Sequence, residues 1–447
     1  RISCGSLEIT DGKRSTQLGG IVERTATIVG QGYVGLPLAQ AAAKAGWKIW
    51  GLDTNAKTVE ALNNGKSHVD DLSDDEISEM ISLGYEATVD PTCIANSQVV
   101  VVCVPTPLGD AGSPDLRAVE AATSTVGRHL RKGSTYILES TTYPGTTDNV
   151  CIPLLEGHSK FVAGKDFHVA YSPERVDPGS KKFGIANTPK LVGGLDAESS
   201  AKAKEFYGSF IDTVVDIEGT KEAETAKLLE NTFRHVNIAL VNEMAQFCNE
   251  LGINIWEVIR GASTKPFGFM RFNPGPGVGG HCIPIDPNYL SYEVRKELGY
   301  PFRFVELAQE INNSMPTYVV DRAVRLLNTE KKSLNGSNVL LLGITYKPNI
   351  ADQRQSPAVP VAQRLLSLGA DLHYHDPFVE KWNVSDDPND DEIMLDRESD
   401  LNSAVNNADI VILLQPHSDY DIADLVDKAD LFFDTVGITE GNKAHRL

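Results

Sequence analysis

The segment that most constrains the fold of this chain is residues 25–53, where a glycine-rich turn joins an apolar run to a helical pattern. The turn reads Gly30-x-Gly32-x-x-Gly35, and a second apolar run ends at Asp53. Strand, turn, helix and strand in this order predict a βαβ unit, with the acidic residue 18 positions after the last glycine. The context favours a dinucleotide-binding turn over a glycine-rich turn in some other α/β sheet.

The same segment indicates which dinucleotide binds. The glycines permit a tight turn and let a pyrophosphate approach the N-terminus of the following helix. Asp53 is expected to accept hydrogen bonds from the adenosine ribose, and its charge would repel the 2′-phosphate of NADP. NAD is therefore the expected cofactor, although Lys57 is near enough in sequence to leave NADP open.

Two further apolar runs end in polar turns. The first run, residues 99–104, is followed by Pro105 and Thr106. The second run, residues 134–138, is followed by Glu139 and then by Ser140 to Thr142. Ligands of doubly wound sheets lie beyond the carboxyl ends of the strands, so topology places these turns near the cofactor. Ordinary turn chemistry explains them equally well.

Composition excludes several classes of protein. The chain has 447 residues and a formal net charge of −20, which argues against bulk binding to nucleic acid or to an anionic membrane. The apolar runs are too short to span a bilayer, so no membrane association is expected. Six scattered cysteines indicate reduced thiols, with neither a disulfide framework nor a metal site. A cytoplasmic protein with an N-terminal extension at residues 1–24 is expected.

A second strand and helix order recurs late in the chain. NVLLLGITYKP predicts a strand and turn, SPAVPVAQRLLSLG a helix, LHYHD a strand that ends at Asp376, and ADIVILLQPHSDY a further strand. This copy lacks the glycine fingerprint. It predicts a second Rossmann-like domain that holds a different nucleotide.

Between the two α/β parts lies a long helical segment, roughly Glu222 to Leu251. Its apolar character on several faces predicts burial between domains or subunits, so at least a dimer is expected. Lys227, Asn231 and Arg234 recur at i, i+4 and i+7 and share one face. Such a stripe is usually solvated, but on a buried helix a shared ligand explains it better.

The most unusual segment is FGFMRFNPGPGVGGHCIPIDPNYL. Glycines at 275, 277, 279 and 280 permit unusual backbone angles and close contact with a ligand, and they exclude a regular helix. A cysteine in such a rigid loop, Cys282 with Asp286 nearby, is a candidate nucleophile. The alternative is a small buried apolar residue.

Together these motifs resemble one known family. GQGYVGLPLA, CVPTP, ESTTYPGTT, YSPERVDPG, AETAKLLENTFRHVNIALVNE, NPGPGVGGHCIPIDP and GITYKPNIADQRQSP occur in the order found in the UDP-glucose/GDP-mannose dehydrogenases. Within that family they most resemble the UDP-N-acetylglucosamine 6-dehydrogenases. The resemblance extends from about Thr25 to Asp434.

The resemblance implies an α/β architecture of two Rossmann-like domains joined by a long central helix and a helical dimerisation region. The implied boundaries are 25–216 for the NAD-binding domain, 217–330 for the helical region with the cysteine loop, and 331–447 for the UDP-binding domain. The implied reaction oxidises the sugar C6 alcohol to a carboxylate with two NAD, through a cysteine thiohemiacetal and a thioester. The implied product is a precursor of surface polysaccharide.

Matching the motifs position by position also implies residue roles. The implied catalytic set is Cys282, Lys227, Asn231, Asp286, Thr141 and Glu174. The implied cofactor set is Gly30, Gly32, Tyr33, Val34, Gly35, Asp53, Lys57, Thr106, Thr141 and Arg354. The implied set for the UDP-sugar is Glu174, Arg175, Lys227, Asn231, Arg234, Arg271, Phe272, Asn273, Pro274, Gly275, Gly279 and Lys347.

Three departures from the family pattern bear on the substrate. Ile285 stands where UDP-glucose dehydrogenases have lysine, Arg271 stands where close relatives have proline, and Asp434 begins an unusual DTVG. UDP-N-acetylmannosamine and UDP-glucose therefore remain alternative substrates. An epimerase would use a Tyr-x-x-x-Lys pair such as Tyr292 and Lys296, but that pair lies outside the first dinucleotide domain. A sensor of UDP-sugar without turnover is the remaining alternative.

Overall fold

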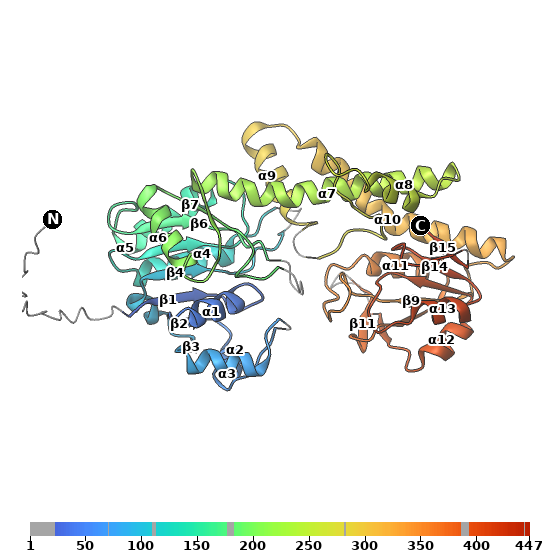
Figure 1. Cartoon of the computed structure of the whole chain (residues 1–447), viewed down its shortest axis with the longest axis horizontal. Helices are drawn as coiled ribbons and strands as arrows, with labels where there is room; N and C mark the ends of the chain where they lie inside the picture. The colour runs from blue at the N-terminus through green and yellow to red at the C-terminus, as the bar shows by residue number, and fades with distance from the viewer. Residues whose placement is uncertain are drawn as a thin grey trace, which may run out of the picture.

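The computed structural model describes residues 23–69, 71–109, 113–176, 183–280, 283–385, 393–441 and 443–447. Two α/β lobes lie side by side, and one long helix runs across both of them (Figure 1). Most of the expected N-terminal extension, and His281 and Cys282 of the cysteine loop, are outside the described residues.

The N-terminal lobe contains an eight-stranded sheet in the order β3-β2-β1-β4-β5-β6-β7-β8. All neighbours run parallel except β6 and β7, which are antiparallel. The strand order reverses between β1 and β4, which is where a doubly wound sheet binds its ligand. The strands are β1 (Thr25–Val29), β2 (Lys48–Leu52), β3 (Tyr85–Thr88), β4 (Val99–Val102), β5 (Thr135–Leu138), β6 (His168–Tyr171), β7 (Lys190–Gly194) and β8 (Val214–Ile217).

Helices cover both faces of this sheet, which explains why β4 is apolar throughout. Val99 and Val101 pack into one core cluster with α1, whereas Val100 and Val102 pack into another with α4 and α5. The helices of this lobe are α1 (Gly35–Lys44), α2 (Ala56–Asn63), α3 (Asp74–Ser82), α4 (Arg117–His129), α5 (Ile152–Ser159) and α6 (Ala197–Tyr207), with the short turns η1 (Pro91–Asn96) and η3 (Thr147–Cys151).

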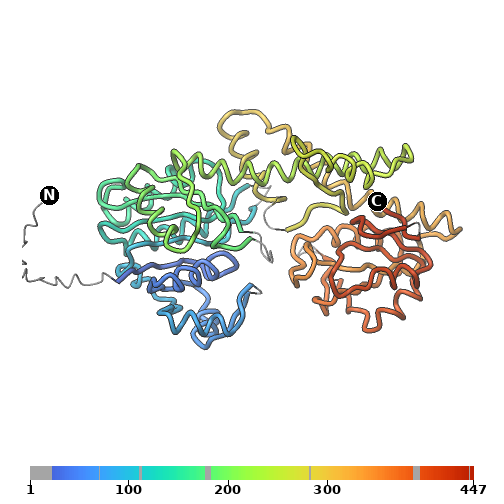
Figure 2. The backbone as a smooth tube through the Cα atoms, in the orientation of Figure 1, coloured from blue at the N-terminus to red at the C-terminus, as the bar shows by residue number. Residues whose placement is uncertain are grey.

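The central helix α7 (Thr220–Glu250) begins two residues before the start expected from the sequence and ends one residue before the expected end. It packs along α10 (Arg303–Thr329), and a hydrogen bond of 2.9 Å from Asn242 Nδ2 to Asn312 Oδ1 joins the two. The shorter helices α8 (Ile255–Ala262) and α9 (Asp286–Leu298) complete this layer. Figure 2 shows α7 passing from the N-terminal lobe to the C-terminal lobe.

The C-terminal lobe is a second parallel sheet, in the order β10-β9-β13-β14-β15. A second Rossmann-like sheet was expected here, and it is present. Its strands are β9 (Asn338–Leu342), β10 (Asp371–His375), β13 (Ile410–Leu413), β14 (Phe432–Asp434) and β15 (Ala444–Arg446). Its other elements are α11 (Ala358–Ser367), α12 (Leu401–Asn407), α13 (Ile422–Lys428) and the antiparallel pair β11 (Lys381–Asn383) and β12 (Met394–Asp396).

Membrane spans and metal clusters are both absent from the described part of the chain. No helix in it is long and apolar enough to cross a membrane. In that same part, no group of three or more histidine, cysteine or acidic side chains is arranged to hold a metal ion. Cys93, Cys103, Cys151 and Cys248 are buried free thiols.

Candidate active site

The turn after β1 has the geometry that its glycines predict. Gly30 has φ +92°, and a Cβ there would lie 2.6 Å from the carbonyl oxygen of Cys103. A Cβ on Gly35 would lie 1.9 Å from the Gly30 carbonyl oxygen, so neither position tolerates a side chain. A Cβ on Gly32, in contrast, would meet no atom within 4 Å. This open space at the N-terminus of α1 fits a pyrophosphate.

Asp53, directly after β2, stabilises the same turn through hydrogen bonds. One carboxylate oxygen accepts a hydrogen bond of 2.9 Å from the Gln31 amide, and the other accepts one of 2.8 Å from the Asn55 amide. The carboxylate remains half-buried, so it keeps acceptor capacity for ribose hydroxyls. Lys57 is exposed on the first turn of α2, and Tyr33 is exposed at the start of α1. The turn, Asp53 and the open space therefore fit NAD.

Beneath the loop after β5 lies a buried ion pair that sequence reasoning missed. Glu139 Oε1 lies 2.5 Å from Lys190 Nζ and accepts a hydrogen bond of 2.6 Å from the Tyr207 hydroxyl. Burial raises the pKa of Glu139, and the Lys190 ammonium opposes that effect. The available signal was a lysine at the start of the apolar segment KLVGG, because a buried lysine requires a partner. The pair anchors the residue that precedes Ser140.

The centre of the candidate site is formed where α7 meets the first residue of α9. Asn231 Nδ2 donates a hydrogen bond of 2.5 Å to Asp286 Oδ2, although the residues are 55 positions apart. Lys227, Asn231 and Asp286 are all buried. Burial raises the pKa of Asp286 to about 6, while the Lys227 charge and the Asn231 hydrogen bond act in the opposite direction. A carboxyl group tuned in this way can exchange a proton near neutral pH.

The segment after β6 connects to this centre. Lys227 Nζ donates to the backbone carbonyl of Glu174, so this ammonium is fixed beside the loop. Arg175 forms an ion pair with Glu230 of α7, with 2.8 Å between Nη2 and Oε1, and donates to the Pro189 carbonyl at 2.6 Å. Arg175 therefore holds the loop against α7, a role that the sequence did not indicate.

Arg234 and Thr141, two further residues of the expected substrate and catalytic sets, are less buried than Lys227 and Asn231. Arg234 is exposed, unlike Lys227 and Asn231, so the stripe expected on α7 is buried at only two of its three positions. Thr141 is half-buried after β5. The hydroxyl of its neighbour Thr142 is buried and has no hydrogen-bond partner among the described residues, which leaves it able to bind a water or a ligand.

Glu224, one helical turn before Lys227, is a second buried carboxyl that the sequence did not single out. It accepts hydrogen bonds of 2.5 Å from the Gly145 amide, 2.8 Å from the Thr147 amide and 2.7 Å from the Thr147 hydroxyl. Burial raises its pKa to about 7, against the effect of these donors. Glu224 therefore ties the loop after β5 to the helix that carries Lys227.

The protonation of Glu224 predicts how stability depends on pH. Because its pKa is raised from 4.5 to about 7, the folded chain binds this proton more tightly than the unfolded chain does. The free energy of unfolding should therefore fall as pH rises from about 4.5 to about 7, by up to about 1.4 kcal/mol per pH unit. We expect Glu224→Gln to flatten this decline in urea titrations.

The control is Glu222→Gln, which changes an exposed carboxylate two residues earlier on the same helix. It should leave the pH dependence of the wild type unchanged. A Glu224→Gln variant whose unfolding free energy declines as steeply as that of the wild type would show that Glu224 does not bind this proton.

The segment before the cysteine is fixed at several points. The Gly275 amide donates a hydrogen bond of 3.0 Å to Asn242 Oδ1 on α7, and Pro274 is buried. The Phe272 ring meets Phe233 edge to face, with 5.8 Å between centroids. Arg271 and Asn273 are exposed and joined by a hydrogen bond of 3.0 Å. These contacts hold residues 272–275 against α7.

At the next glycines the chain approaches the C-terminal lobe closely, and the ligand contact expected of Gly279 stays a prediction. A Cβ on Gly279 would lie 2.7 Å from the Gln355 carbonyl oxygen and 2.9 Å from Tyr346 Cβ. Gly280 has φ +90°, and a Cβ there would lie 2.9 Å from the Tyr346 ring. These glycines let the segment that precedes the cysteine dock on the turn after β9.

This docking predicts different effects for two glycine substitutions. Gly279→Ala should lower the free energy of unfolding by about 1–3 kcal/mol, because the new methyl group overpacks the contact with Tyr346 and Gln355. Gly275→Ala is the matched control, since a Cβ there would meet no atom within 4 Å. Thermal unfolding of both variants measures the difference. Equal melting temperatures would contradict the docking.

The C-terminal lobe brings two expected residues to the same junction. Arg354 donates to Asp352 at 2.9 and 2.8 Å, and its pKa is raised by Asp352 and, to a smaller extent, by Tyr33 of the NAD-binding lobe. Arg354 therefore lies near the dinucleotide turn of the other lobe. Lys347 is half-buried in the turn after β9, where its carbonyl accepts a hydrogen bond of 2.8 Å from Thr345.

Tyr292 and Lys296, the pair that an epimerase would use, lie outside the candidate site. Tyr292 and Lys296 lie on α9, and Lys296 Nζ is 3.5 Å from Glu293 and 3.4 Å from Glu297. Lys296 is thus paired with carboxylates of its own helix. Such pairing is typical of a solvated helical face.

An open dinucleotide turn at a sheet reversal, in a chain that also holds a buried lysine and a buried carboxyl of raised pKa, is characteristic of a dinucleotide-dependent dehydrogenase. Three models of the UDP-glucose/GDP-mannose dehydrogenase family match this chain: the NAD-binding domain at residues 24–211, the central domain at 221–314 and the UDP-binding domain at 340–441. The chain belongs to this family of nucleotide-sugar dehydrogenases, and its first lobe is an NAD-binding domain.

Relatives and solved structures agree on the family but differ in substrate. The chain is 36% identical over 366 residues to UDP-N-acetyl-D-glucosamine 6-dehydrogenase of Salmonella typhi, covering 82% of this chain and 85% of the relative. It is 33% identical over 401 residues to UDP-N-acetyl-D-mannosamine dehydrogenase of Methanocaldococcus jannaschii, covering 88% and 86%. The solved UDP-D-ManNAc dehydrogenase of Pyrococcus horikoshii aligns with a TM-score of 0.84 at 29% identity, covering 94% and 98%.

Proposed function

We propose that this protein is an NAD-dependent UDP-N-acetylglucosamine 6-dehydrogenase. The observation that carries the proposal is the buried set of Lys227, Asn231 and Asp286 at the meeting of α7 and α9, close to the NAD-binding lobe. The match to the UDP-binding domain model supports a UDP-sugar substrate. The relative from Salmonella typhi supports the N-acetylglucosamine configuration.

The second candidate is the oxidation of UDP-N-acetylmannosamine. The structural similarity to the Pyrococcus horikoshii enzyme, with a TM-score of 0.84, favours it. The two sugars differ in configuration at C2, and no contact in the described residues distinguishes them. Direct comparison of the substrates decides between the candidates.

In the proposed mechanism, the turn at Gly30 to Gly35 and Asp53 would hold NAD, which would supply the hydride acceptor for two oxidation steps. Cys282 adds as a thiolate to the C6 aldehyde left by the first step, forming a carbon–sulfur bond and a thiohemiacetal. Removal of the second hydride leaves a thioester. Water then breaks the carbon–sulfur bond, releasing the carboxylate and restoring the thiol. The covalent link keeps the reactive aldehyde in the site.

The other residues act on charge and on protons. The Lys227 ammonium, fixed by the Glu174 carbonyl, stabilises the oxyanions that develop at C6. Asp286, held by Asn231, accepts a proton from the attacking water, which requires the ionised carboxyl and therefore a pH above its pKa of about 6. Thr141 and Glu174 complete the water and proton network. Their roles stand on the motif match and are part of the proposal.

The test is the stoichiometry of NADH formation across a panel of sugars. UDP-GlcNAc, UDP-GalNAc, UDP-ManNAc, UDP-glucose and GDP-mannose are each supplied with NAD, and in parallel with NADP. We expect UDP-GlcNAc to give the highest kcat/KM and two NADH per sugar, and NADP to be a poor cofactor. One NADH per sugar with free aldehyde would overturn the thioester mechanism. A higher kcat/KM for UDP-ManNAc would favour the second candidate.

We also infer that two copies of the chain associate through α7. Four exposed apolar side chains of α7, and that of Leu251 directly after it, follow a spacing that places them on one stripe of the helix. An exposed stripe of this length is typical of a subunit interface. Light scattering should give twice the mass of one chain. The stripe consists of Leu229, Phe233, Leu240, Phe247 and Leu251.

A further inference from the structure

The turn after β9 in the C-terminal lobe repeats the hydrogen bonds of the dinucleotide turn in the N-terminal lobe. The Gly343 amide donates to the His375 carbonyl at 3.0 Å, as the Gly30 amide does to the Leu52 carbonyl at 2.8 Å. Likewise, the Ile344 amide donates to Asp376 Oδ2 at 2.8 Å, and the Gln31 amide donates to Asp53 Oδ2 at 2.9 Å. Asp376 therefore occupies in this lobe the position that Asp53 occupies in the first.

The two acidic residues differ in what covers them. Asp53 is half-buried, whereas Asp376 is fully buried, and His417 Nε2 lies 2.9 Å from its Oδ2 atom. The other oxygen, Oδ1, accepts a hydrogen bond of 2.9 Å from the Phe378 amide. Burial alone would raise the pKa of Asp376, but the donors around it outweigh burial and lower it. Both oxygens are engaged within the protein, so Asp376 is not placed to bind a ribose.

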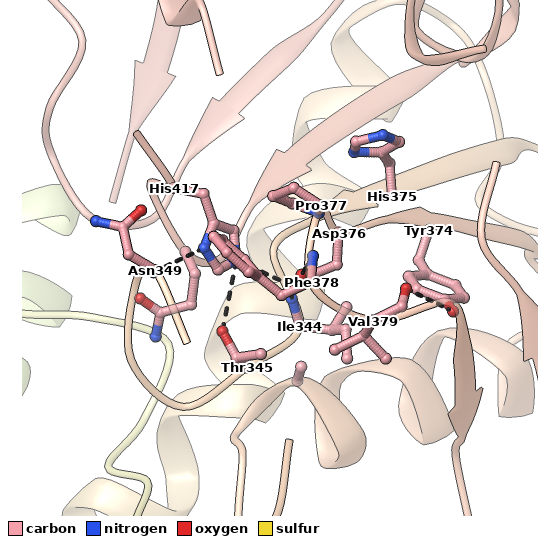
Figure 3. A network of polar contacts seen from close by, with 12 residues as sticks. Ile344, Thr345, Asn349, Tyr374, His375, Asp376, Pro377, Phe378, Val379 and His417 are labelled. Atoms are coloured by element: carbon pink, nitrogen blue, oxygen red, sulfur yellow. Dashed lines mark hydrogen bonds and ion pairs between the residues drawn. The ribbon is translucent and has the colours of Figure 1, made fainter. Parts of the chain in front are cut away.

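The other nitrogen of His417 fixes the far end of the turn. Its Nδ1 atom accepts a hydrogen bond of 2.9 Å from the Asn349 amide, and this defines Nε2 as the protonated nitrogen that faces Asp376. Asn349 has φ +63°, and its side-chain oxygen accepts a hydrogen bond of 2.8 Å from the Ser418 amide. Figure 3 shows His417 between Asp376 on one side and Asn349 on the other.

The six residues from Ile344 to Asn349 are thus fastened at both ends by one buried pair. Within them, the Tyr346 carbonyl accepts a hydrogen bond of 3.1 Å from Gln415. The Tyr346 ring is also the surface on which Gly280 docks, two positions before Cys282. Lys347 is the next residue. The turn 344–349 therefore contains Lys347, which is proposed to bind substrate. It also contains Tyr346, which contacts the loop that precedes Cys282.

We propose that Asp376 and His417 are positioning residues that set the affinity of the C-terminal lobe for the UDP part of the substrate. They act through the turn 344–349 and touch neither substrate nor cofactor. The proposal rests on the proposed function, because it gives Lys347 a role in binding the nucleotide-sugar.

Two substitutions of His417 separate the two hydrogen bonds. The amide of His417→Gln reaches the position of Nε2, so it keeps a donor to Asp376 and loses the acceptor for Asn349. The amide of His417→Asn reaches the position of Nδ1, so it keeps the acceptor and loses the donor. The control is His373→Gln, which removes a histidine of β10, the strand that precedes Asp376. Its Nδ1 lies 2.8 Å from Glu398 near the surface.

The first measurement is hydrogen exchange of peptides covering residues 343–350, without any ligand. We expect exchange to rise at least about tenfold in His417→Gln and to stay near wild type in His373→Gln. The second is calorimetric titration with UDP and, separately, with NAD. We expect the Kd for UDP to rise at least about tenfold in His417→Gln, less in His417→Asn, and the Kd for NAD to change less than about twofold in both.

Each outcome decides a separate question. Unchanged exchange and an unchanged Kd for UDP in His417→Gln would overturn the proposal, and so would equal losses of UDP and NAD affinity. If His417→Gln does not fold, His417→Asn carries the test, because it removes the donor to Asp376. It should raise exchange and the Kd for UDP in the same direction, and unchanged values would overturn the proposal. A wild-type chain that does not bind UDP would refute the proposed function instead, and the exchange experiment would still test the anchoring of the turn.

Discussion

Cys282→Ser should lower the rate of acid formation on the order of 10³-fold or more, because an alkoxide forms far less readily than a thiolate near neutral pH. Binding of the UDP-sugar should be retained, since the proposed thiol acts on C6 rather than on the nucleotide. The measurements are carboxylate production, NADH per sugar and the Kd of the UDP-sugar. A thioester trapped in the wild type and absent from the variant would identify the covalent step.

The matched control is Cys248→Ala, which alters a buried free thiol on α7. It should keep near-normal turnover, although the lost packing lowers its melting temperature. Near-normal acid formation by Cys282→Ser would remove this cysteine from the mechanism. The cysteine loop would then serve only to join the lobes through Gly279 and Gly280.

Lys227→Met should lower kcat about 10²- to 10³-fold, the usual cost of losing one group that stabilises an oxyanion. The substitution also leaves the buried Asp286 carboxylate without the positive charge that lowers its pKa. The acidic limb of the pH–rate profile should therefore move to higher pH. Initial rates at saturating sugar and NAD across the pH range measure both effects.

Lys221→Met is the control for this variant. Lys221 lies on the first turn of α7, exposed, with its Nζ 3.8 Å from Asp148. An exposed ion pair of this kind contributes less than about 1 kcal/mol, so activity and pH profile should stay near wild type. If Lys227→Met keeps the wild-type kcat, the oxyanion role proposed for Lys227 is wrong.

Much of the architecture could be predicted because its signals are local. The fingerprint at Gly30 and the acidic residue at Asp53 specified the first βαβ unit, and β4 was recognisable as a strand buried on both faces. The repeat of strand and helix patterns predicted the second parallel sheet. These features depend on backbone geometry and hydrophobic periodicity, which act over neighbouring residues.

The site was predicted in part. Lys227 and Asn231 were expected on one face of a buried helix, but their convergence on Asp286 depends on α9 packing against α7. Glu224 was missed because a glutamate in a helix is ordinarily solvated. Only the packing of the loop after β5 onto α7 removes it from water.

By itself, the sequence determined the NAD-binding turn, the two Rossmann-like sheets and the long helix between them, since each arises from spacing within a short segment. Only the tertiary structure decided what the glycines before Cys282 contact and what Asp376 binds. The position directly after the second strand of each sheet holds Asp53, which is half-buried, in the first lobe and Asp376, which is fully buried, in the second. The difference arises from His417, 41 residues further along the chain, which lies against Asp376 only when the second sheet is assembled.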